Sequence, residues 1–442
     1  MTIAIHDWTG LDGAARRRLL ARPRAAAGDG VVADVRAIVG AVRAEGDAAV
    51  RRFTTRFDGV PADRLGALRV AASEFAAARS ALAPHEIAAI ERAITNVETF
   101  HAAQRPAPLS VETMPGVRCD SVLRPIPAVG LYVPAGSAPL PSTVVMLAVP
   151  ARLAGCPQRV LCTPPDRDGR AHPAVLVAAG LCGIDTVFTI GGAQAIAALA
   201  YGTESVPKVD KIFGPGNAWV TAAKQLVAAD PDGAALDLPA GPSEVLVVAD
   251  DSARADFVAA DLLAQAEHDP LAQAILITDS RRLARETIVA IGRQLPQLSR
   301  QAVLAASVAA LRVIVVDDLD TAIGVSNDYA PEHLLLQVRE PRRRLEAIRN
   351  AGSVFIGPWS PEPMGDYCTG ANHVLPTYGH ARACSGLSLL DFTKRMTVQE
   401  LTASGLATLG PTATTLARME GLDAHAAAVD RRLELLARGS VP

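Results

Sequence analysis

The sequence of 442 residues has few aromatic side chains and no stretch of about 18 residues that is apolar and free of proline, glycine and charge. Its first residues lack the apolar core and the small-residue cleavage site of a secretory signal. We therefore expect a cytoplasmic protein that makes no membrane contact. The 43 basic and 46 acidic residues nearly cancel, to a net charge of -3, so the composition predicts neither a nucleic-acid partner nor a membrane partner.

Cysteine is also scarce, and its six positions show no CxxC spacing. A disulfide framework and a thiolate zinc site are therefore not expected, and the thiols should be reduced and act as small apolar side chains. Any metal that this chain binds must then use nitrogen and oxygen ligands. The cysteines are Cys119, Cys156, Cys162, Cys182, Cys368 and Cys384.

Half of the residues are hydrophobic, mostly Ala, Leu and Val, which is typical of a soluble α/β enzyme. Apolar residues recur about every 3.6 positions in residues 31–57 and 84–104, so this part is expected to be helical. From residue 128 onward, short β-rich runs alternate with helical ones, as in GLYVP followed by STVVMLAVPARLAG. Alternation at this spacing predicts βαβ units and parallel sheets.

The segment LDLPAGP at residues 236–242 interrupts this rhythm, and a second alternating set begins at residue 243. We therefore predict an α/β fold with two tandem, open Rossmann-like sheets, a helical N-terminal segment and a helical C-terminal arm, rather than a single barrel. The expected domains are an N-terminal helical arm (1–30), a first α/β domain with the metal and catalytic residues (31–130 with 240–380), a second α/β domain on the nucleotide side (131–239) and a C-terminal helical arm (381–442).

Two of the expected strand-to-helix loops are rich in glycine, IGGAQA at 190–195 and FGPGNA at 213–218. Glycine lets a ligand approach the backbone closely, and the helix N-terminus that follows favours an anion. Gln194 and Asn217 stand at these loops, where the carboxyl ends of parallel strands meet ligands. Neither loop matches GxGxxG, so tight turns alone also explain the glycines.

Polar groups at four further places can serve chemistry, and each has a simpler structural alternative. In DLLAQAEHDP, helical spacing puts Gln265 and His268 on one face, which suits metal ligands but also a structural hydrogen-bonded pair. Glu332 and His333 precede an apolar strand, where an acid beside a histidine can act as an acid–base pair. Solvated loop charges explain that pair equally well.

The other two places lie closer to the C-terminus. Asp366 and His373 belong to GDYCTGANHVLPT, a loop dense in glycine and proline that is long for a plain connection, which favours a function. Glu420 and His425 lie on or near a C-terminal helix, in MEGLDAHAAAV. There the simpler explanation is that both side chains are exposed to solvent.

Long motifs follow one another along nearly the whole chain: GLYVPAG, IGGAQAIAALAYGT, KIFGPGNAWVTAAK, DLPAGPSEVLVVAD, LLAQAEHDPLAQ, NDYAPEHL, MGDYCTGANHVLPT and FTKRMTVQELT. Together they resemble the histidinol dehydrogenase family. The resemblance implies a zinc-dependent oxidation of L-histidinol through L-histidinal to L-histidine that consumes two NAD, with one Zn²⁺ per subunit. Nitrogen and oxygen ligands suit Zn²⁺ but also allow Mn²⁺ or Co²⁺. The metal ligands implied are Gln265, His268, Asp366 and His425.

The resemblance also assigns roles to other residues. His333 is the implied general base for the alcohol and for the aldehyde hydrate, and Glu332 is the group that activates water in the second oxidation. The substrate contacts implied are the metal ligands with Ser243, His333, His373 and Glu420, and the nucleotide contacts are Tyr132, Gln194 and Asn217. The family is a homodimer with shared active sites, in which the C-terminal arm carries its glutamate and histidine to the partner subunit.

Three alternatives stay open. A paralogous zinc- and NAD-dependent dehydrogenase could act on another small alcohol, such as a sulfonated diol, although it would be expected to lose His373 and Glu420. An inactive homologue that only binds nucleotide or metal would not need Glu332 and His333. A periplasmic solute-binding protein also has two α/β domains, but the N-terminus shows no signal peptide.

Overall fold

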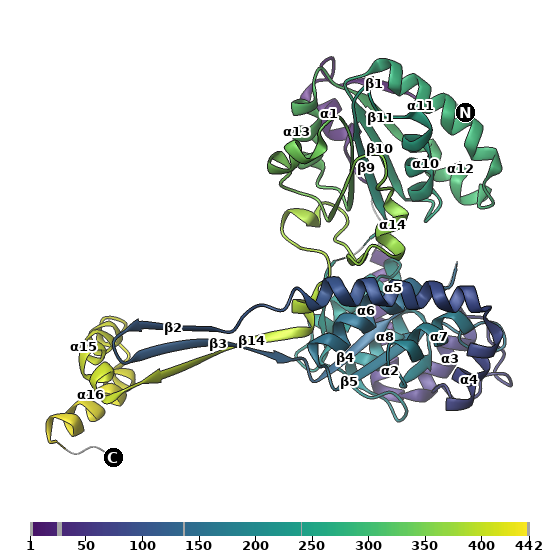
Figure 1. Cartoon of the computed structure of the whole chain (residues 1–442). Helices are drawn as coiled ribbons and strands as arrows, with labels where there is room; N and C mark the ends of the chain where they lie inside the picture. Colours follow the sequence, from purple (N-terminus) through teal and green to yellow (C-terminus); the bar gives the residue numbers. More distant parts are fainter. Residues whose placement is uncertain (1–2, 24–28, 136–137, 240, 440–442) are drawn as a thin grey trace. The chain divides into compact units, whose positions relative to one another are not determined.

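The computed structural model describes residues 3–23, 29–135, 138–239 and 241–439, and Figure 1 shows the course of the chain. Helices surround parallel sheets, which confirms the predicted α/β class. The chain forms two compact units, residues 1–104 with 126–392 and residues 105–125 with 393–442. Each unit is described by itself. Gly136 of GLYVPAG and Ala240 of LDLPAGP lie outside the described residues.

The first unit contains a five-stranded parallel sheet with the order β6-β5-β4-β7-β8. In β4 (Ala128–Tyr132), Val129 and Leu131 pack in one hydrophobic core, whereas Ala128 and Tyr132 pack in the other, on the opposite face. Burial on both faces explains the continuous apolar run in the sequence. The strand order reverses at β4, so ligands are expected at the carboxyl ends of β4 and β7. The other strands are β5 (Gln158–Thr163), β6 (Val187–Thr189), β7 (Lys211–Phe213) and β8 (Ala235–Leu236).

Helices cover both faces of this sheet (Figure 1). One core joins the sheet to α6 (Pro141–Ala154) and α7 (Pro173–Leu181), with α4 (Ala72–Ala81) and α5 (Pro84–Ala102) packed against them. The other core joins it to α8 (Gly192–Tyr201) and α9 (Ala218–Ala228), with α2 (Asp29–Glu45) and α3 (Asp47–Phe57).

The helices of residues 29–102 therefore pack on the five-stranded sheet, whereas we expected residues 31–130 to share a domain with residues 240–380. In α2, the apolar stripe of Val35, Ile38, Val39 and Val42 is buried in the core that α8 and α9 also form. Periodicity shows that such a helix buries one face, but it does not show which sheet receives that face.

The same unit contains a six-stranded parallel sheet with the order β1-β11-β10-β9-β12-β13. Its edge strand β1 (Ile5–Asp7) lies within the segment expected to be a helical arm, of which α1 (Gly13–Leu19) is helical. Three paired residues are too few to show alternation in a sequence, and the pairing of Ile5 with Val313 is a long-range contact. The other strands are β9 (Glu244–Ala249), β10 (Gln273–Thr278), β11 (Arg312–Val315), β12 (His333–Gln337) and β13 (Ser353–Ile356).

Helices flank this second sheet as the alternating pattern predicts. α10 (Ala255–Ala266), α11 (Arg281–Gln294) and α12 (Gln301–Ala309) share a core with one face, and α13 (Leu319–Tyr329) shares a core with the other. The short α14 (Glu362–Tyr367) follows β13. The 3₁₀ helices are η1 (Leu295–Gln297), η2 (Pro341–Ala347), η3 (His380–Arg382) and η4 (Leu389–Phe392).

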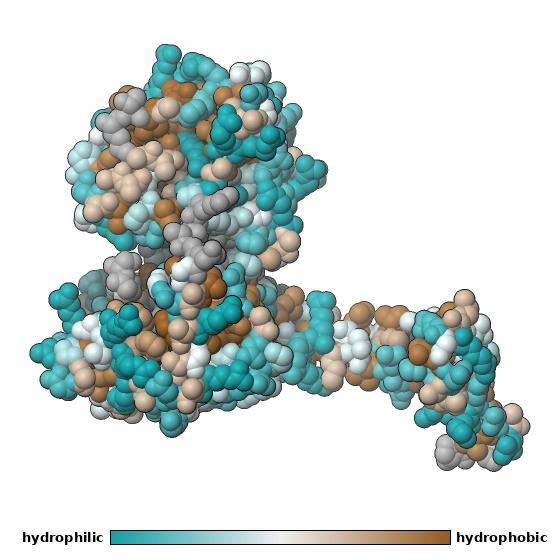
Figure 2. Space-filling model, turned by 180° about the vertical axis from the view of Figure 1, so that it is seen from behind, coloured by the Kyte–Doolittle hydropathy of each residue, from teal (hydrophilic) through white to brown (hydrophobic). Residues whose placement is uncertain are grey.

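The second unit is a three-stranded antiparallel sheet with two helices. The sheet has the order β14-β3-β2, from β2 (Leu109–Met114), β3 (Val117–Pro125) and β14 (Thr393–Leu401), and α15 (Ala403–Met419) and α16 (Asp423–Ala437) follow. The arm expected to be helical from residue 381 thus includes a strand, because nine of its residues pair with β3. Figure 2 shows hydrophobic side chains among the hydrophilic ones on the surface of this unit.

Two expectations drawn from absences can be compared with the structure. All six cysteines are free, as predicted, and burial raises the pKa of Cys156 to about 11 and that of Cys182 to about 12. Among the described helices, none combines the length and apolar character that crossing a bilayer requires.

Candidate active site

The predicted catalytic pair lies at the amino edge of the six-stranded sheet. Glu332 immediately precedes β12 and His333 is its first residue, in register with Val245 of β9 and Ser353 of β13. Glu332 is 5% exposed and His333 is 3% exposed. These groups are therefore not solvated loop charges, and a buried acid beside a buried imidazole needs a different explanation.

Glu244, the first residue of β9, holds both members of the pair. Its N–H donates to Oε2 of Glu332 over 2.7 Å, and its carbonyl oxygen lies 3.1 Å from Nδ1 of His333. A carbonyl oxygen only accepts, so we infer that Nδ1 carries the proton and that Nε2 is the basic nitrogen of the neutral ring. Within the described residues Nε2 has no hydrogen-bond partner, and Oδ1 of Asp366 lies 3.6 Å away. His333 is thus oriented to accept a proton at Nε2.

The side chain of Glu244 is fixed in turn by a buried ion pair. Arg22 donates to both of its carboxylate oxygens, and Nη2 of Arg22 also donates to the carbonyl oxygen of Tyr329 over 2.8 Å. The guanidinium carbon lies 3.9 Å from the centre of the Tyr329 ring, and the N–H of Tyr378 donates to the same carboxylate over 3.1 Å. These contacts anchor the residue that orients the catalytic pair. No sequence pattern points to Arg22, which is more than 200 residues from its partner along the chain.

The two polar residues of α10 lie at its C-terminal end. Gln265 is completely buried, and within the described residues neither atom of its amide has a hydrogen-bond partner. His268 follows the helix, and its N–H donates to the carbonyl oxygen of Gln265 over 3.2 Å. A buried amide without a partner costs free energy, so Gln265 is better explained as a ligand of an external group than as a structural hydrogen-bonding residue.

Asp366 on α14 approaches two of the histidines. Its Oδ2 lies 4.0 Å from Nε2 of His268, and its Oδ1 faces Nε2 of His333. Glu362, one turn earlier on the same helix, is fully buried, and within the described residues neither carboxylate oxygen has a partner. His268, Glu362 and Asp366 each offer one ligand atom, and these atoms lie within 4.8 Å of one another. Sequence reasoning missed Glu362, although two acids four residues apart beside the loop gave a recognisable signal.

Burial dominates the electrostatics of the carboxyl groups. It raises the pKa of Glu332 to about 8 and that of Glu362 to about 8. Burial also acts to raise the pKa of Asp366, but the close contact with His333 and the charge of that ring outweigh it and lower this pKa to about 2. Burial opposes a charge on His333, whereas Glu332 and the two carboxyls of α14 raise its pKa to about 10 and so favour the protonated ring. A cation held by Asp366 would oppose that charge and favour the neutral ring, which is the form that accepts a proton at Nε2. The cluster of carboxylates therefore attracts positive charge.

The donor set fits a divalent metal ion. Gln265 offers an amide oxygen without a partner, His268 a ring nitrogen and Asp366 a carboxylate oxygen. Such donors suit Zn²⁺ and are shared by Mn²⁺ and Co²⁺. A cation would also satisfy polar groups whose burial is otherwise unfavourable, which is the structural reason to expect one here.

His373 connects this cluster to the five-stranded sheet. Its Nδ1 lies 2.8 Å from the backbone carbonyl oxygen of Asp366, and its Nε2 lies 3.3 Å from Oγ1 of Thr143, near the start of α6. Burial lowers the pKa of His373, so the neutral ring donates at Nδ1 and accepts at Nε2. Ser243 stands directly before Glu244 and is half-buried. Both residues thus lie next to the catalytic pair or to a candidate metal ligand.

The three residues expected on the nucleotide side lie at the carboxyl edge of the five-stranded sheet. Tyr132 ends β4, and its hydroxyl accepts from the N–H of Gly192 over 3.1 Å. Gln194 is 1% exposed, and its Nε2 donates to Oδ2 of Asp58 over 3.3 Å. Asn217 is exposed and caps α9, because its Oδ1 accepts from two backbone N–H groups. The structure shows this capping role for Asn217, while nucleotide binding stays a prediction.

The loop after β7 approaches the end of β4 closely. Gly214 has φ of 123°, and a Cβ at this position would lie 2.1 Å from the carbonyl oxygen of Tyr132. Its N–H donates to Asp237 over 2.8 Å, and buried Lys224 binds both its carbonyl oxygen and Asp237. A small hollow beside the loop is lined in part by these glycine and lysine residues. Only glycine fits here, so the glycine of the FGPGNA motif has a structural cause whether or not a nucleotide binds.

Glu420 and His425 belong to the second unit. Glu420 follows the last residue of α15, His425 lies in the first turn of α16, and both are exposed. Their participation in the site stays a prediction.

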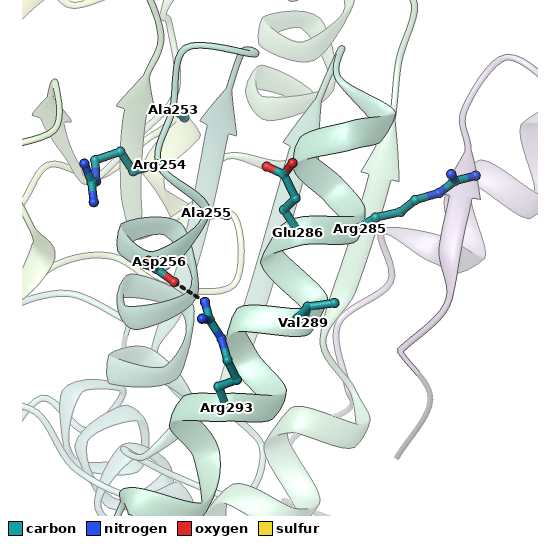
Figure 3. Close-up of a pocket in the computed structure, with 8 residues that line it drawn as sticks. All are labelled: Ala253, Arg254, Ala255, Asp256, Arg285, Glu286, Val289 and Arg293. Atoms are coloured by element: carbon teal, nitrogen blue, oxygen red, sulfur yellow. Dashed lines mark hydrogen bonds and ion pairs between the residues drawn. The ribbon is translucent and has the colours of Figure 1, made fainter.

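A further hollow lies between the start of α10 and the exposed face of α11 (Figure 3). Both of its carboxylates already have partners: Arg293 donates to Asp256 and Arg282, just outside it, donates to Glu286, each over 2.6 Å. None of the predicted site residues lines this hollow. It therefore offers no competing active site.

Comparison with known proteins gives matches along nearly the whole chain. The family model described as histidinol dehydrogenase matches residues 21–433. Histidinol dehydrogenase from Vibrio vulnificus (strain CMCP6) is 52% identical over 433 residues, which are 98% of this chain and 99% of that protein. The enzyme of that name from Xanthomonas euvesicatoria pv. vesicatoria (strain 85-10) is 54% identical and is covered in full. The crystal structure of histidinol dehydrogenase from Elizabethkingia anophelis superposes on this chain with a TM-score of 0.93. The two sequences are 43% identical, and the match covers 99% of both chains.

Proposed function

Since the chain belongs to the histidinol dehydrogenase family, we propose that it completes histidine biosynthesis by oxidising L-histidinol through L-histidinal to L-histidine. It is an NAD-dependent oxidoreductase, and two NAD are consumed for each histidine formed. The structural observation that carries the proposal is the orientation of His333, whose Nδ1 is fixed by the carbonyl of Glu244 while Nε2 faces the metal-ligand cluster. No described residue favours a different alcohol or an inactive homologue.

In the first oxidation, Nε2 of His333 takes the hydroxyl proton of histidinol as the carbinol hydride leaves for NAD. The ring needs no rearrangement for this step, because Nδ1 already donates to Glu244. The positive charge that forms on His333 is stabilised by Asp366 and by Glu332, whose nearest oxygen atoms lie 3.6 Å and 3.7 Å from the ring nitrogens.

The second oxidation requires water as well as a base. Glu332 accepts a proton from the water that adds to the aldehyde, and the aldehyde oxygen takes the proton that His333 gained in the first oxidation, which gives the hydrate and restores the neutral ring. His333 then deprotonates the hydrate as the second hydride leaves. Burial raises the pKa of Glu332 to about 8, so this carboxyl can take up and release a proton near neutral pH. Two adjacent groups can thus divide the work between alcohol and water.

We assign one zinc ion per subunit to Gln265, His268 and Asp366 together with His425 from the C-terminal arm of the partner subunit. When bound, zinc supplies Lewis-acid attraction for the amine and imidazole nitrogens of histidinol and so orients the carbinol carbon. The buried, unpartnered amide of Gln265 supports this assignment. Ser243, His373 and Glu420 are assigned to the substrate, and Tyr132, Gln194 and Asn217 to NAD.

The homodimer expected of the family is also part of the proposal. In the second unit, several apolar side chains are 41–78% exposed, which is unfavourable for a free surface and is explained by a partner subunit. They are Leu109, Val111, Met396, Val398, Leu416 and Met419. A monomeric variant that still bound zinc tightly in the presence of histidinol would contradict the shared site.

The proposal is tested by the stoichiometry of the reaction and by two variants. Purified protein with L-histidinol and NAD should form about two NADH per histidine, and removal of the metal by a chelator should abolish the reaction. His333→Asn should slow both oxidations by about 100-fold to 10,000-fold, because it removes the general base. Glu332→Gln should act mainly on the second oxidation, measured with L-histidinal as substrate.

Exposed Glu286 provides a matched control. It lies on α11, donates no group to the cluster and pairs with Arg282 at the surface, so Glu286→Gln should leave both oxidations unchanged. One NADH per turnover, or full activity after removal of the metal, would contradict the proposed mechanism.

A further inference from the structure

Glu362 is a buried titratable group for which the proposed mechanism gives no role. Its side chain is fully buried, and within the described residues neither carboxylate oxygen has a hydrogen-bond partner. A carboxylate in this state is unfavourable unless a donor or a cation reaches it. Its position is nonetheless well defined, because α14 places it one turn before Asp366.

The carboxyl group of Glu362 faces the metal-ligand cluster, where a partner could reach it. One carboxylate oxygen of Glu362 lies within 4.8 Å of a ring nitrogen of His268 and of an oxygen of Asp366. Side chains at this separation can touch a common small group placed among them. That group carries positive charge or N–H donors, because all the neighbouring oxygen atoms are acceptors.

Zinc itself is not the best occupant for Glu362. The proposed ligands Gln265, His268, Asp366 and His425 would already supply the four donors that zinc ordinarily takes. A further carboxylate from Glu362 would therefore not be needed to hold the metal. The N–H groups of the substrate amine, by contrast, would need acceptors when histidinol is bound at the metal.

We propose that Glu362 is a specificity residue of the substrate site, whose carboxylate accepts hydrogen bonds from the α-amino group of the amino alcohol. This inference rests on the proposed function, since it takes L-histidinol as the substrate. It explains why a carboxylate without a protein partner is buried next to Asp366 and His268. It also gives the site a means to reject imidazolyl alcohols that lack the amine, because they would leave this carboxylate without a donor.

The test compares two ligands on two proteins. Wild type and Glu362→Gln are loaded with zinc, and calorimetry without NAD measures the Kd of L-histidinol and of 3-(imidazol-4-yl)propan-1-ol, which differs by the amino group. We expect Glu362→Gln to raise the Kd of L-histidinol by about 10-fold to 100-fold, the range for one hydrogen bond to a charged group. The Kd of the alcohol without the amine should change less than about threefold.

Zinc affinity, measured by competition with a chelator in the absence of ligand, provides a second readout. It should be the same in wild type and Glu362→Gln within about threefold. The proposal would be overturned if Glu362→Gln weakened the binding of both ligands equally, weakened the binding of neither, or lost zinc affinity tenfold. The last outcome would make Glu362 a metal ligand instead.

Two further proteins keep the result interpretable. Asp261→Asn is the matched control, because Asp261 is also a buried carboxyl, on α10, but already accepts from Gln337 over 3.3 Å. It should change neither Kd by more than about twofold. Glu362→Met replaces the glutamine variant if thermal melting shows that the latter is not folded. Wild-type protein that binds L-histidinol but forms no NADH would contradict the proposed function and leave this comparison of ligands standing.

Discussion

Replacement of Arg22 by methionine should destabilise the protein strongly, because it leaves a buried carboxylate without its cation. The Glu244 side chain is completely buried and that of Arg22 is 14% exposed. Breaking a buried ion pair by removing one partner costs about 3–5 kcal/mol. The N–H of Tyr378 remains as a donor to Glu244, so we expect a loss near the lower end of that range.

Denaturation by urea, followed by circular dichroism, gives the free energy of unfolding for a thermodynamic cycle. Arg22→Met, Glu244→Leu and the double variant are compared with wild type. The free energy of unfolding should fall less in the double variant than in Arg22→Met alone, because an apolar pair of similar volume can replace a buried ion pair at little cost. Arg343→Met removes an exposed pair with Glu340 and should have little effect.

The same substitution should also slow catalysis without weakening zinc binding. Glu244 places Glu332 through its N–H and His333 through its carbonyl, so movement of this residue misaligns both. A misplacement of about 1 Å is enough to reduce kcat by up to about 100-fold. Arg22→Lys should recover part of the loss, since lysine restores the charge but not the paired donors. A loss of less than about 1 kcal/mol in Arg22→Met would refute this account of the ion pair.

Burial raises the pKa of Asp261 in the folded protein to about 7, above the value of this carboxyl in the unfolded chain. The stabilisation that the protonated carboxyl provides is therefore complete below about pH 4 and is lost as the pH rises through 7. Asp261→Asn should therefore be about 2–4 kcal/mol more stable than wild type in urea at pH 8 and not at pH 4; an equal difference at both pH values would contradict this. Gly214→Ala should weaken NADH binding by at least about tenfold and lower the melting temperature, because the backbone at φ of 123° and the carbonyl of Tyr132 leave no room for Cβ. Lys224→Met should lower the free energy of unfolding, measured in urea, by about 3–5 kcal/mol, because it leaves the buried carboxylate of Asp237 without its cation. Adding Asp237→Leu to the same chain should recover most of that loss.

The parts of the fold that could be predicted are those set by local periodicity. Strands such as β4 and β9 are buried on both faces and therefore read as continuous apolar runs between helical segments. The domain to which α2 belongs could not be read in this way, because its apolar stripe fits any complementary surface. The edge strand β1 and the strand β14 owe their conformation to pairing with residues far away along the chain.

The candidate site shows the same division between local and long-range information. Helical spacing brought Gln265 and His268 together, and a loop rich in glycine drew attention to Asp366. Arg22 and Asp58 were missed, since their roles arise from contacts with Glu244 and Gln194 that only the folded chain creates. The sequence also does not show which side chains are buried, and its burial is what distinguishes Glu332 from an ordinary loop carboxylate.

The location of the catalytic pair runs against the usual rule for open α/β sheets, in which ligands bind at the carboxyl ends of strands. Glu332 and His333 lie at the amino edge of their sheet, whereas Tyr132 lies at the carboxyl edge of the other sheet. Two sites on different sheets can serve a hydride transfer only if the structure holds their reacting atoms about 3–3.5 Å apart.

The segment after α14 supplies such a connection. Nδ2 of Asn372 donates to the carbonyl oxygen of Met146 over 2.7 Å, and Nε2 of His373 lies 3.3 Å from Oγ1 of Thr143. Both partners belong to α6, which follows β4 of the five-stranded sheet, where we propose that NAD binds. Nδ1 of the same histidine is held by the carbonyl oxygen of Asp366, a candidate metal ligand. His373 therefore links Asp366 to α6, in addition to the substrate contact that we propose for it.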